Sequence, residues 1–190
     1  MTFRIEPVTS DLIDDMGRLL GTDRAAGGCW CMWFIVPVKD YHRAGSGGNR
    51  ASFCDLMASS EQPLGLLAYQ ADEPMGWCAV GPRSHYRRAL KTPTYLGRDP
   101  GEDDSVWLVP CFFVRRDARR AGLGQMVLQA AVGLAKEHGA ITIEGFPFSG
   151  GKRRSSDTQV GFASVFSACG FEAIRTPSPS RVIMRRELTG

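Results

Sequence analysis

One stretch decides the fold: Val106-Trp107-Leu108-Val109-Pro110-Cys111-Phe112-Phe113-Val114, followed by Arg115-Arg116-Asp117-Ala118-Arg119-Arg120-Ala121-Gly122-Leu123-Gly124. Its first half is β-branched, aromatic and uncharged, which predicts a central strand buried on both faces. Pro110 has no N–H to donate to a neighbouring strand, so it predicts a bulge or a splayed edge in the middle of this strand. Apolar residues three or four apart then predict a helix from about Leu123 that ends at Gly139.

The turn between this strand and this helix has the composition of a phosphate site. Gly122 and Gly124 lack side chains that would hold an anion away from the backbone, and arginines stand beside them. A helix N-terminus adds unpaired N–H groups and the positive end of a dipole. The plainer alternative is that the two glycines only shape the turn. P-loop and dinucleotide patterns do not fit, because a Gly-Lys-Ser/Thr ending and a third glycine are missing.

Two motifs resemble the GNAT superfamily of N-acetyltransferases. Arg119-x-x-Gly122-x-Gly124 after a buried strand is similar to that family's acyl-CoA signature. Val165-Phe166-Ser167-Ala168-Cys169-Gly170-Phe171 resembles its late helix, which typically carries a Tyr, three variable residues and then Gly-Phe. The resemblance implies a single domain over residues 1–190. It also implies an α/β fold with a mixed central sheet of about seven strands and about four helices, in the order β-α-α-β-β-β-α-β-α-β-β.

Length and charge fit one globular domain that binds a small anion. A chain of 190 residues can bury one sizeable core. The net charge of +3 is too small to indicate nucleic acid by itself, whereas the basic clusters at 115–120 and 152–154 suit a polyanionic small molecule. The latter cluster is also explained as a solvated loop. No run approaches the roughly 20 apolar residues of a membrane span, and no signal peptide precedes the first strand, so we expect a cytoplasmic protein.

Cysteine usage indicates reduced thiols rather than a metal centre. The six cysteines lie among apolar neighbours, as free core cysteines do. Only Cys29 and Cys31 are close together, and no second Cys or His pair completes a zinc site. We therefore expect no metal.

Local patterns predict the remaining elements. A stripe of Leu12, Ile13, Met16, Leu19 and Leu20 predicts the first helix, and a second, short helix is expected from Asn49 or Ser52 to Ser59. A long loop covers 84–104, a length that is usually functional or mobile. Strands are predicted at 3–8, 64–70, 75–80, 140–146, 171–175 and 181–188, and a late helix at 162–169.

The acceptor site is predicted from an aromatic and sulfur-rich segment. Gly27–Phe34 is explained equally well as packed core or, by the resemblance, as a wall of the acceptor pocket between the first two helices. We expect Cys29–Phe34, within this segment, and the loop at 84–104 to form that pocket together. The predicted substrate-binding residues are Trp30, Trp33, Trp77 and His85.

The resemblance also implies the donor and the reaction. Acetyl-CoA would be the co-substrate, with direct transfer of its acyl group to a small amine or a protein amine in a ternary complex. A free backbone N–H near Phe112 or Phe113 would polarise the thioester carbonyl. Neither nucleic acid nor a membrane is expected as a partner, and the chain would act as a monomer or homodimer. The residues implied in acyl-CoA binding are Phe112, Phe113, Val114, Arg119, Arg120, Ala121, Gly122, Leu123, Gly124 and Gln125.

Proton transfer is where the sequence departs from the family pattern. The position of the late-helix tyrosine is Phe166, which cannot donate a proton. Either the thiolate leaves unassisted or another group serves as the acid. Each of the following groups also has a plain structural explanation. The base candidates are Glu144, then Glu102, Asp103, Asp104 and His85, and the acid candidates are Tyr86, Tyr95, Ser167 and Cys111.

The missing tyrosine keeps a second class of function open. A non-catalytic acyl-CoA-binding or regulatory module on the same fold would not need a proton donor. A nucleic-acid binder that uses the two basic clusters is a more distant alternative, and the salt dependence of DNA binding would identify it.

Overall fold

The computed structural model describes residues 2–22, 27–119, 121–151 and 159–188. In these ranges the chain forms a seven-stranded sheet with the strand order β1-β2-β3-β4-β5-β7-β6. Neighbouring strands are antiparallel except for β4 and β5, which are parallel. The strands are β1 (Arg4–Pro7), β2 (Gly65–Gln70), β3 (Glu73–Pro82), β4 (Val106–Val114), β5 (Thr142–Gly145), β6 (Glu172–Ser178) and β7 (Arg181–Glu187).

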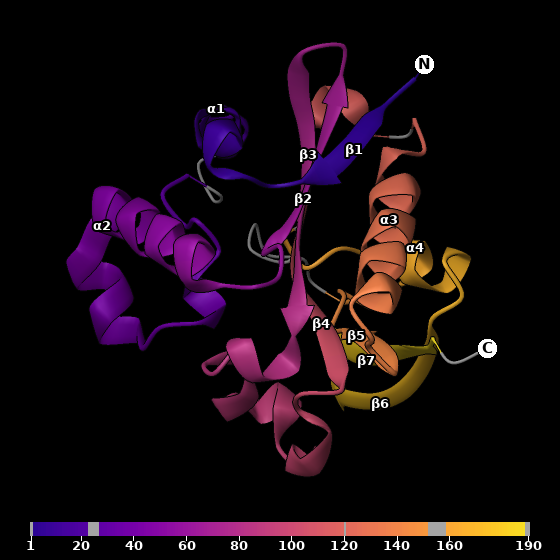
Figure 1. The fold of residues 1–190 in the computed structure, drawn as a ribbon. Coiled ribbons are helices and arrows are strands. Elements are labelled where there is room, and N and C mark those ends of the chain that lie inside the picture. Colours follow the sequence, from indigo (N-terminus) through magenta and orange to yellow (C-terminus); the bar gives the residue numbers. More distant parts are fainter. Residues whose placement is uncertain (1, 23–26, 120, 152–158, 189–190) are drawn as a thin grey trace.

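Helices cover both faces of this sheet (Figure 1). α1 (Ile13–Gly21) and α2 (Val38–Ser59) lie on one face, and α3 (Leu123–Glu137) and α4 (Ala163–Ala168) lie on the other. This mixed α/β arrangement and its element order confirm the predicted fold class. Within the described ranges, no helix has the length and apolar character needed to cross a bilayer.

Of the two helices on this face of the sheet, the sequence predicts α1 well and α2 only in its second half. Ile13, Met16, Leu19 and Leu20 are all buried, as the spacing predicts. α2 begins eleven or more positions before the predicted start, at Val38 after Pro37. Its first half is polar and rich in glycine, which is a weak helix signal. The helix accordingly kinks at Gly45, whose backbone is non-helical at φ 60° and ψ −170°.

The central strand β4 carries the predicted bulge. Ala79 pairs with Cys111 and Gly81 pairs with Leu108, so one residue of β3 lies opposite two residues of β4 between these pairs. The extra residue lies at Val109–Pro110, where proline cannot complete a ladder bond. It reverses the alternation of side chains: Trp107, Val109 and Phe112 join the core under α3, whereas Cys111 and Phe113 join the core under α1 and α2.

β4 and β5 separate just beyond this bulge. Their parallel pairing runs from Val106 opposite Thr142 to Val109 opposite Gly145 and then ends. Farther along β4, an isolated bridge joins Phe112 to Val160, which belongs to the segment before α4. The second half of β4 therefore has a regular partner, β3, on only one side.

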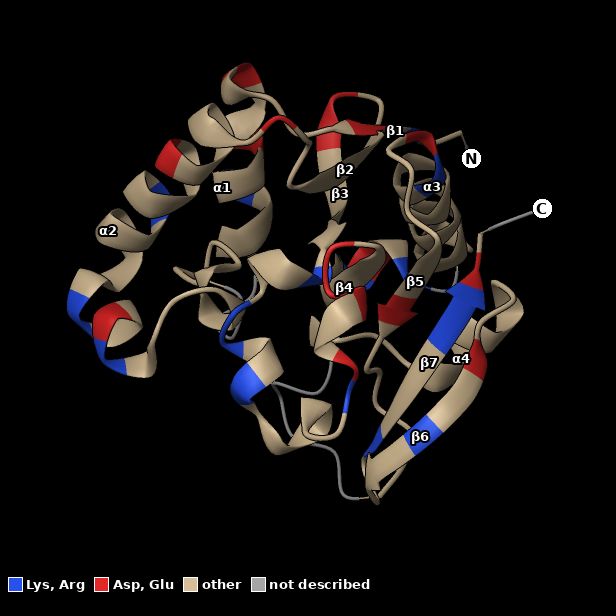
Figure 2. Cartoon of the chain, turned by 60° about the horizontal axis from the view of Figure 1, so that its bottom comes forward, with Lys and Arg blue, Asp and Glu red and all other residues tan. Residues whose placement is uncertain are grey.

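The segment at 84–104 is a packed layer rather than an open loop. It forms short 3-10 turns, and Tyr86, Leu90 and Tyr95 are buried against Leu108 of β4. Arg83 is 1% exposed and anchors the layer: it donates to Asp103 at 2.7 Å, to the Asp99 carbonyl at 2.7 Å and to Glu144 of β5 at 3.2 Å. Arg185 of β7 extends this ion cluster to Glu102, and Figure 2 shows the acidic turn before β4 near the basic part of β7.

Two element ends are explained by single residues. Gly139 has φ +78° directly after α3, as expected for a glycine that terminates a helix. β6 continues past the predicted end at Arg175 to Ser178, through Pro177. A proline is tolerated there because β6 is the edge strand of the sheet.

Candidate active site

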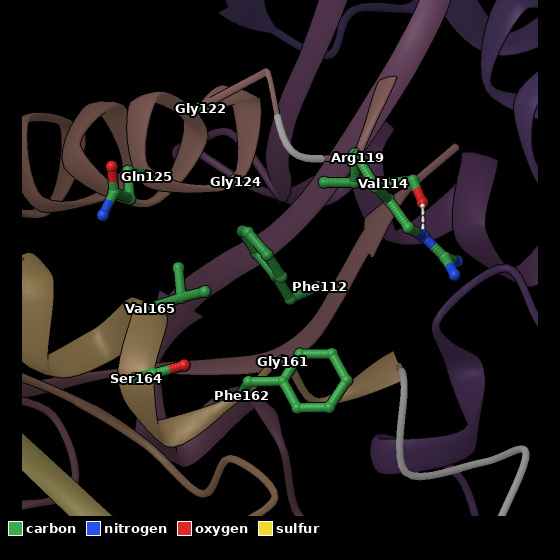
Figure 3. Close-up of a pocket in the computed structure, with 10 residues that line it drawn as sticks. All are labelled: Phe112, Val114, Arg119, Gly122, Gly124, Gln125, Gly161, Phe162, Ser164 and Val165. Atoms are coloured by element: carbon green, nitrogen blue, oxygen red, sulfur yellow. Dashed lines mark hydrogen bonds between the residues drawn. The ribbon is translucent and has the colours of Figure 1, made fainter. Parts of the chain in front are cut away.

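The first component of the site is the N-terminus of α3. Gly122 precedes the helix in the left-handed region at φ +79°, and among the described residues no side chain caps the helix. The first N–H groups of a helix have no intrahelical acceptor, and they carry the positive end of its dipole. They face a pocket of about 580 Å³, whose wall comes from β4, from the turn into α3 and from the segment at 161–165 (Figure 3). This end of the pocket is suited to a phosphate group.

The two glycines of the turn have different roles. A Cβ on Gly122 would meet nothing within 4 Å, so only its positive φ requires glycine. A Cβ on Gly124 would lie 3.4 Å from Phe112 Cζ and 3.8 Å from Val165 Cγ1. Glycine at 124 therefore keeps a passage open between β4 and α4, as Figure 3 shows.

The other residues that were predicted to bind acyl-CoA fall into three groups. Val114 and Gln125 line the pocket, and Arg119 stands at its rim, where its Nε donates to the Val114 carbonyl at 2.9 Å. In Figure 3 the Arg119 guanidinium points away from the glycines. Leu123 is 0% exposed and turns into the core, so it offers the pocket only its backbone. Ala121 is exposed beside Gly122, and Arg120 lies outside the described residues.

A second pocket of about 420 Å³ lies on the face that α1 and α2 cover. Both segments expected to wall the acceptor site reach it: Cys29 and Trp33 from one, and Thr92 and Tyr95 from the other. Tyr41 of α2, Phe146, Gln159, Val160 and Arg181 complete much of its lining. Burial raises the pKa of the Cys29 thiol to about 11, so this cysteine is protonated at neutral pH.

The two pockets are lined by adjacent residues of one segment, beside the separation of β4 from β5. Phe112 and Gly161 line the first pocket, while Gln159 and Val160 line the second. The segment from 159 to 161 thus passes between the pockets, and the Phe112–Val160 bridge holds it beside β4.

Of the predicted substrate residues, only Trp33 lines the second pocket. Trp30 is 6% exposed and Trp77 is 0% exposed, and both belong to the core under α1 and α2. Trp77 Nε1 donates to Cys31 Sγ at 2.9 Å inside that core. His85 lies in a separate surface hollow with Ser60 and Asp104, and burial lowers its pKa. The geometry therefore favours structural roles for these two tryptophans and separates His85 from the pocket.

Glu144, the first candidate for the base, is buried and already paired with arginines. It is 1% exposed, and both of its carboxylate oxygens accept hydrogen bonds from guanidinium groups. Oε2 lies 3.2 Å from Arg83, and Oε1 lies 2.7 and 2.9 Å from two nitrogens of Arg185. These contacts favour a structural role, in which Glu144 ties the 84–104 layer to the sheet.

Tyr86, a candidate acid, and Phe166, at the position of the family's late-helix tyrosine, both lie inside the core. Tyr86 is 4% exposed, and a Cβ on Gly81 would lie 3.5 Å from its hydroxyl. Burial raises the Tyr86 pKa well above its usual value, so the hydroxyl stays protonated. Phe166 is 0% exposed and packs edge-on against Phe171, with ring centroids 5.0 Å apart. Its ring also lies against Gly145, and it does not line the first pocket.

Sequence reasoning missed the residues that the fold brings in from distant segments. Phe162, Ser164 and Gly161 line the first pocket, and Phe146, Gln159 and Arg181 line the second. Gly161 has φ +76°. An isolated glycine before the predicted late helix is the one local signal that could have identified this segment. The other residues belong to no motif, so no local pattern identifies them.

Comparison with known proteins gives a consistent result. A family model described as the acetyltransferase (GNAT) family matches residues 29–147. The structure of an acetyltransferase from Thermus thermophilus is similar, with a TM-score of 0.57 and 16% identity over 99% of this chain and 98% of that chain. A search of curated proteins found no match.

Two similar structures contain coenzyme A or acetyl-CoA. PaiA N-acetyltransferase from Thermoplasma acidophilum, in complex with coenzyme A, has a TM-score of 0.56 and 11% identity over 98% of this chain and 99% of that chain. YncA from Salmonella typhimurium, with its cofactor acetyl-CoA, has a TM-score of 0.58 and 10% identity over 100% of this chain and 95% of that chain. At such identities the likeness establishes the fold.

Proposed function

This chain belongs to the GNAT acetyltransferase family, and we propose that it transfers an acetyl or short acyl group from acyl-CoA to an amine by direct attack in a ternary complex. The amine nitrogen forms a bond to the thioester carbonyl carbon, and the carbon–sulfur bond breaks. The proton lost by the nitrogen ends on the sulfur of coenzyme A, directly or through another group. The observation that carries this proposal is the position of two pockets on either side of residues 159–161, which the Phe112–Val160 bridge holds beside β4.

The donor binds, in this proposal, in the pocket at the N-terminus of α3. The pyrophosphate accepts hydrogen bonds from the N–H groups of residues 122–125, and Arg119 at the rim adds positive charge. The pantetheine arm follows the second half of β4 past Phe112. Complexes of similar folds with coenzyme A and acetyl-CoA support this choice of ligand.

Main-chain groups would carry the electrostatic part of catalysis. As the thioester is attacked, negative charge develops on its carbonyl oxygen, and a backbone N–H of β4 near Phe112 or Phe113 would stabilise it. β4 has no regular strand partner on one side beyond Val109, which supports this assignment. Phe113 would take part through its backbone alone, because its side chain faces the opposite core.

Direct transfer is favoured over a covalent intermediate. A thioester-forming cysteine needs an accessible thiolate. Cys29 lines the second pocket, in which we propose that the acceptor amine binds, but its raised pKa keeps it protonated. Cys111 is buried at 6% exposure under α1 and α2. Attack by the amine itself therefore needs fewer assumptions.

Proton transfer has two candidate routes. In the first, the coenzyme A thiolate leaves unassisted and then takes the proton of the amine, since a thiol's ordinary pKa is about 8.5. In the second, a protein side chain donates, and Tyr86 is the candidate that the sequence suggests, although it lines neither pocket. A general acid typically contributes about 10²-fold or more to the rate. Replacing Tyr86 by Phe distinguishes the routes, with an unchanged kcat expected for the first.

Acetyl-CoA binding and turnover test the proposal separately. Calorimetry measures acetyl-CoA binding, and release of free thiol in the presence of amines measures turnover. Tight binding with no turnover of any amine would support the alternative, a non-catalytic acyl-CoA-binding module. Absence of binding would contradict both. Light scattering of the purified protein would establish whether it is a monomer or a homodimer, and cell fractionation would test the cytoplasmic location that we propose.

A further inference from the structure

The side chain of Arg119 lies against β4 at the rim of the proposed donor pocket. Its Nε donates to the Val114 carbonyl at 2.9 Å, and both residues line that pocket (Figure 3). Among the described residues, no Asp or Glu forms an ion pair with this guanidinium. Arg119 therefore holds a neutral carbonyl, although a phosphate would be a stronger acceptor for it.

The Val114 carbonyl belongs to the side of β4 that has no regular strand partner. Consecutive residues of an antiparallel strand direct their N–H and C=O groups to alternate sides. The N–H of Arg115, the residue after β4, donates to Met75 of β3 at 2.9 Å, so the main-chain groups of Val114 face the opposite side. By the same alternation Phe112 faces this side, where its isolated bridge lies. Arg119 thus covers the end of the free edge of β4.

The turn that carries Arg119 is fixed in its backbone, whereas Arg119 itself is exposed. Residues 116–118 form a 3-10 turn, in which the Ala118 N–H donates to the Arg115 carbonyl at 3.0 Å. Ala118 is 3% exposed and packs into the core under α3. The Arg119 guanidinium can therefore turn from the Val114 carbonyl toward the N-terminus of α3 while the backbone stays in place.

We infer that Arg119 makes binding of the pantetheine arm conditional on the pyrophosphate of coenzyme A. In the free protein, Arg119 holds the Val114 carbonyl. In the complex, its guanidinium turns to the pyrophosphate, and an amide N–H of the pantetheine replaces it on that carbonyl. This inference rests on the proposed function and deepens it, because it assigns to one residue the selection of complete coenzyme A over its phosphate-free arm.

The exchange is favourable only when a phosphate is present. S-Acetylpantetheine, which is acetyl-CoA without its nucleotide and phosphates, has to displace Arg119 from Val114 and offers the guanidinium no charged partner. Inorganic pyrophosphate has the opposite effect, because it draws Arg119 away and frees the edge of β4. A ligand shifts an equilibrium between two conformations by its difference in affinity for them, and coupling between two ligands is reciprocal. Pyrophosphate and S-acetylpantetheine should therefore strengthen each other's binding.

Calorimetry of the wild type and of Arg119→Met tests this coupling. Saturating pyrophosphate should lower the Kd of S-acetylpantetheine about two- to tenfold in the wild type, the range for one hydrogen bond to a neutral group. Arg119→Met should abolish that effect and bind S-acetylpantetheine alone about two- to tenfold more tightly. The same variant should bind acetyl-CoA about fivefold or more weakly, because a charge-assisted bond is lost. A purely structural or purely electrostatic role of Arg119 would not shift the two ligands in opposite directions.

Arg115→Met is the matched control. The Arg115 guanidinium pairs with Asp117 at 2.8 Å and with Glu73 of β3 at 3.6 Å, and it lies outside the described lining of the donor pocket. Its replacement removes one arginine from the same turn and should leave the coupling of the two fragments unchanged.

The outcomes separate this inference from the proposed function. If acetyl-CoA binds but pyrophosphate does not lower the Kd of S-acetylpantetheine, or the coupling persists in Arg119→Met, the inference is overturned and the proposed function stands. If acetyl-CoA does not bind, the proposed function fails and the inference fails with it. If S-acetylpantetheine binds neither protein measurably, a crystal structure of the acetyl-CoA complex decides. Arg119 on the pyrophosphate supports the inference, and Arg119 Nε still on the Val114 carbonyl overturns it.

Discussion

Replacing Gly124 by alanine should separate donor binding from folding. The added Cβ would lie 3.4 Å from Phe112 Cζ and 3.8 Å from Val165 Cγ1, which is ordinary van der Waals contact. Gly124 is the second residue of α3, where alanine is a better helix former than glycine by up to about 1 kcal/mol. We therefore expect the free energy of unfolding to stay unchanged or to rise slightly.

Acyl-CoA binding should fall in the same variant. The methyl group closes the passage between Phe112 and Val165 and covers the N–H groups of the first turn of α3. Loss of one charge-assisted hydrogen bond to a phosphate is about 1.5–3 kcal/mol, which corresponds to a rise in Kd of roughly 10- to 150-fold. Calorimetry with acetyl-CoA measures the Kd, and urea denaturation measures stability.

Gly122→Ala is the matched comparison for this experiment. A Cβ there meets nothing within 4 Å, but φ is +79°, so alanine should cost about 1–2 kcal/mol of stability through backbone strain. Gly122→Ala should therefore lower the free energy of unfolding, whereas Gly124→Ala should leave it unchanged or raise it slightly. Wild-type affinity for acetyl-CoA in a folded Gly124→Ala protein would refute the assignment of the donor site to the N-terminus of α3.

Three further predictions concern the core and its charges. Phe166→Tyr should destabilise the fold by about 1–3 kcal/mol in urea denaturation, because the ring is 0% exposed and packs against Gly145, which leaves its hydroxyl without space or partner; an unchanged stability with a higher kcat would contradict this. Glu144→Gln should cost about 3–5 kcal/mol of stability and leave kcat of the folded protein nearly unchanged, since it removes one partner of a buried ion cluster; a lost kcat at full stability would instead identify Glu144 as a base. Burial alone would raise the pKa of Asp103, but hydrogen bonds from Arg98 and Arg83 outweigh it and hold that pKa below its usual range. The stability from Asp103 is therefore present above its unfolded pKa of about 3.9 and is lost as the pH falls through its lowered folded pKa, and acid denaturation of Arg98→Ala should show a smaller loss.

The elements that could be predicted from sequence are those with a strong local pattern. β4 is uniformly apolar, α3 carries an apolar stripe, and Gly139 ends that helix. The bulge followed from a single residue, Pro110, because a missing donor has a fixed structural cost. The first half of α2 could not be predicted, since it is polar and contains Gly45, Gly47 and Gly48.

The two halves of the candidate site differ in how well the sequence predicts them. Its donor side is one continuous motif, in which backbone and spacing carry the information. Its acceptor side combines Tyr95, Phe146 and Gln159, which only the tertiary fold brings together. Large aromatic residues are equally suited to a core and to a pocket wall, so sequence alone could not separate Trp33 from Trp77. Alternation likewise could not reveal that Arg83 and Arg185 hold Glu144.

The separation of β4 from β5 has a kinetic consequence for the proposed enzyme. The proposed donor pocket is lined by Gly124 of α3 and Val165 of α4, and the proposed acceptor pocket by Tyr41 of α2. These helices cover opposite faces of the sheet, so the two pockets lie on opposite faces. If each substrate enters from its own face, neither blocks the other, and coenzyme A would be able to leave while the acetylated amine is still bound. Initial-rate kinetics should therefore follow a random order of addition, in which each product competes only with the substrate that shares its entrance.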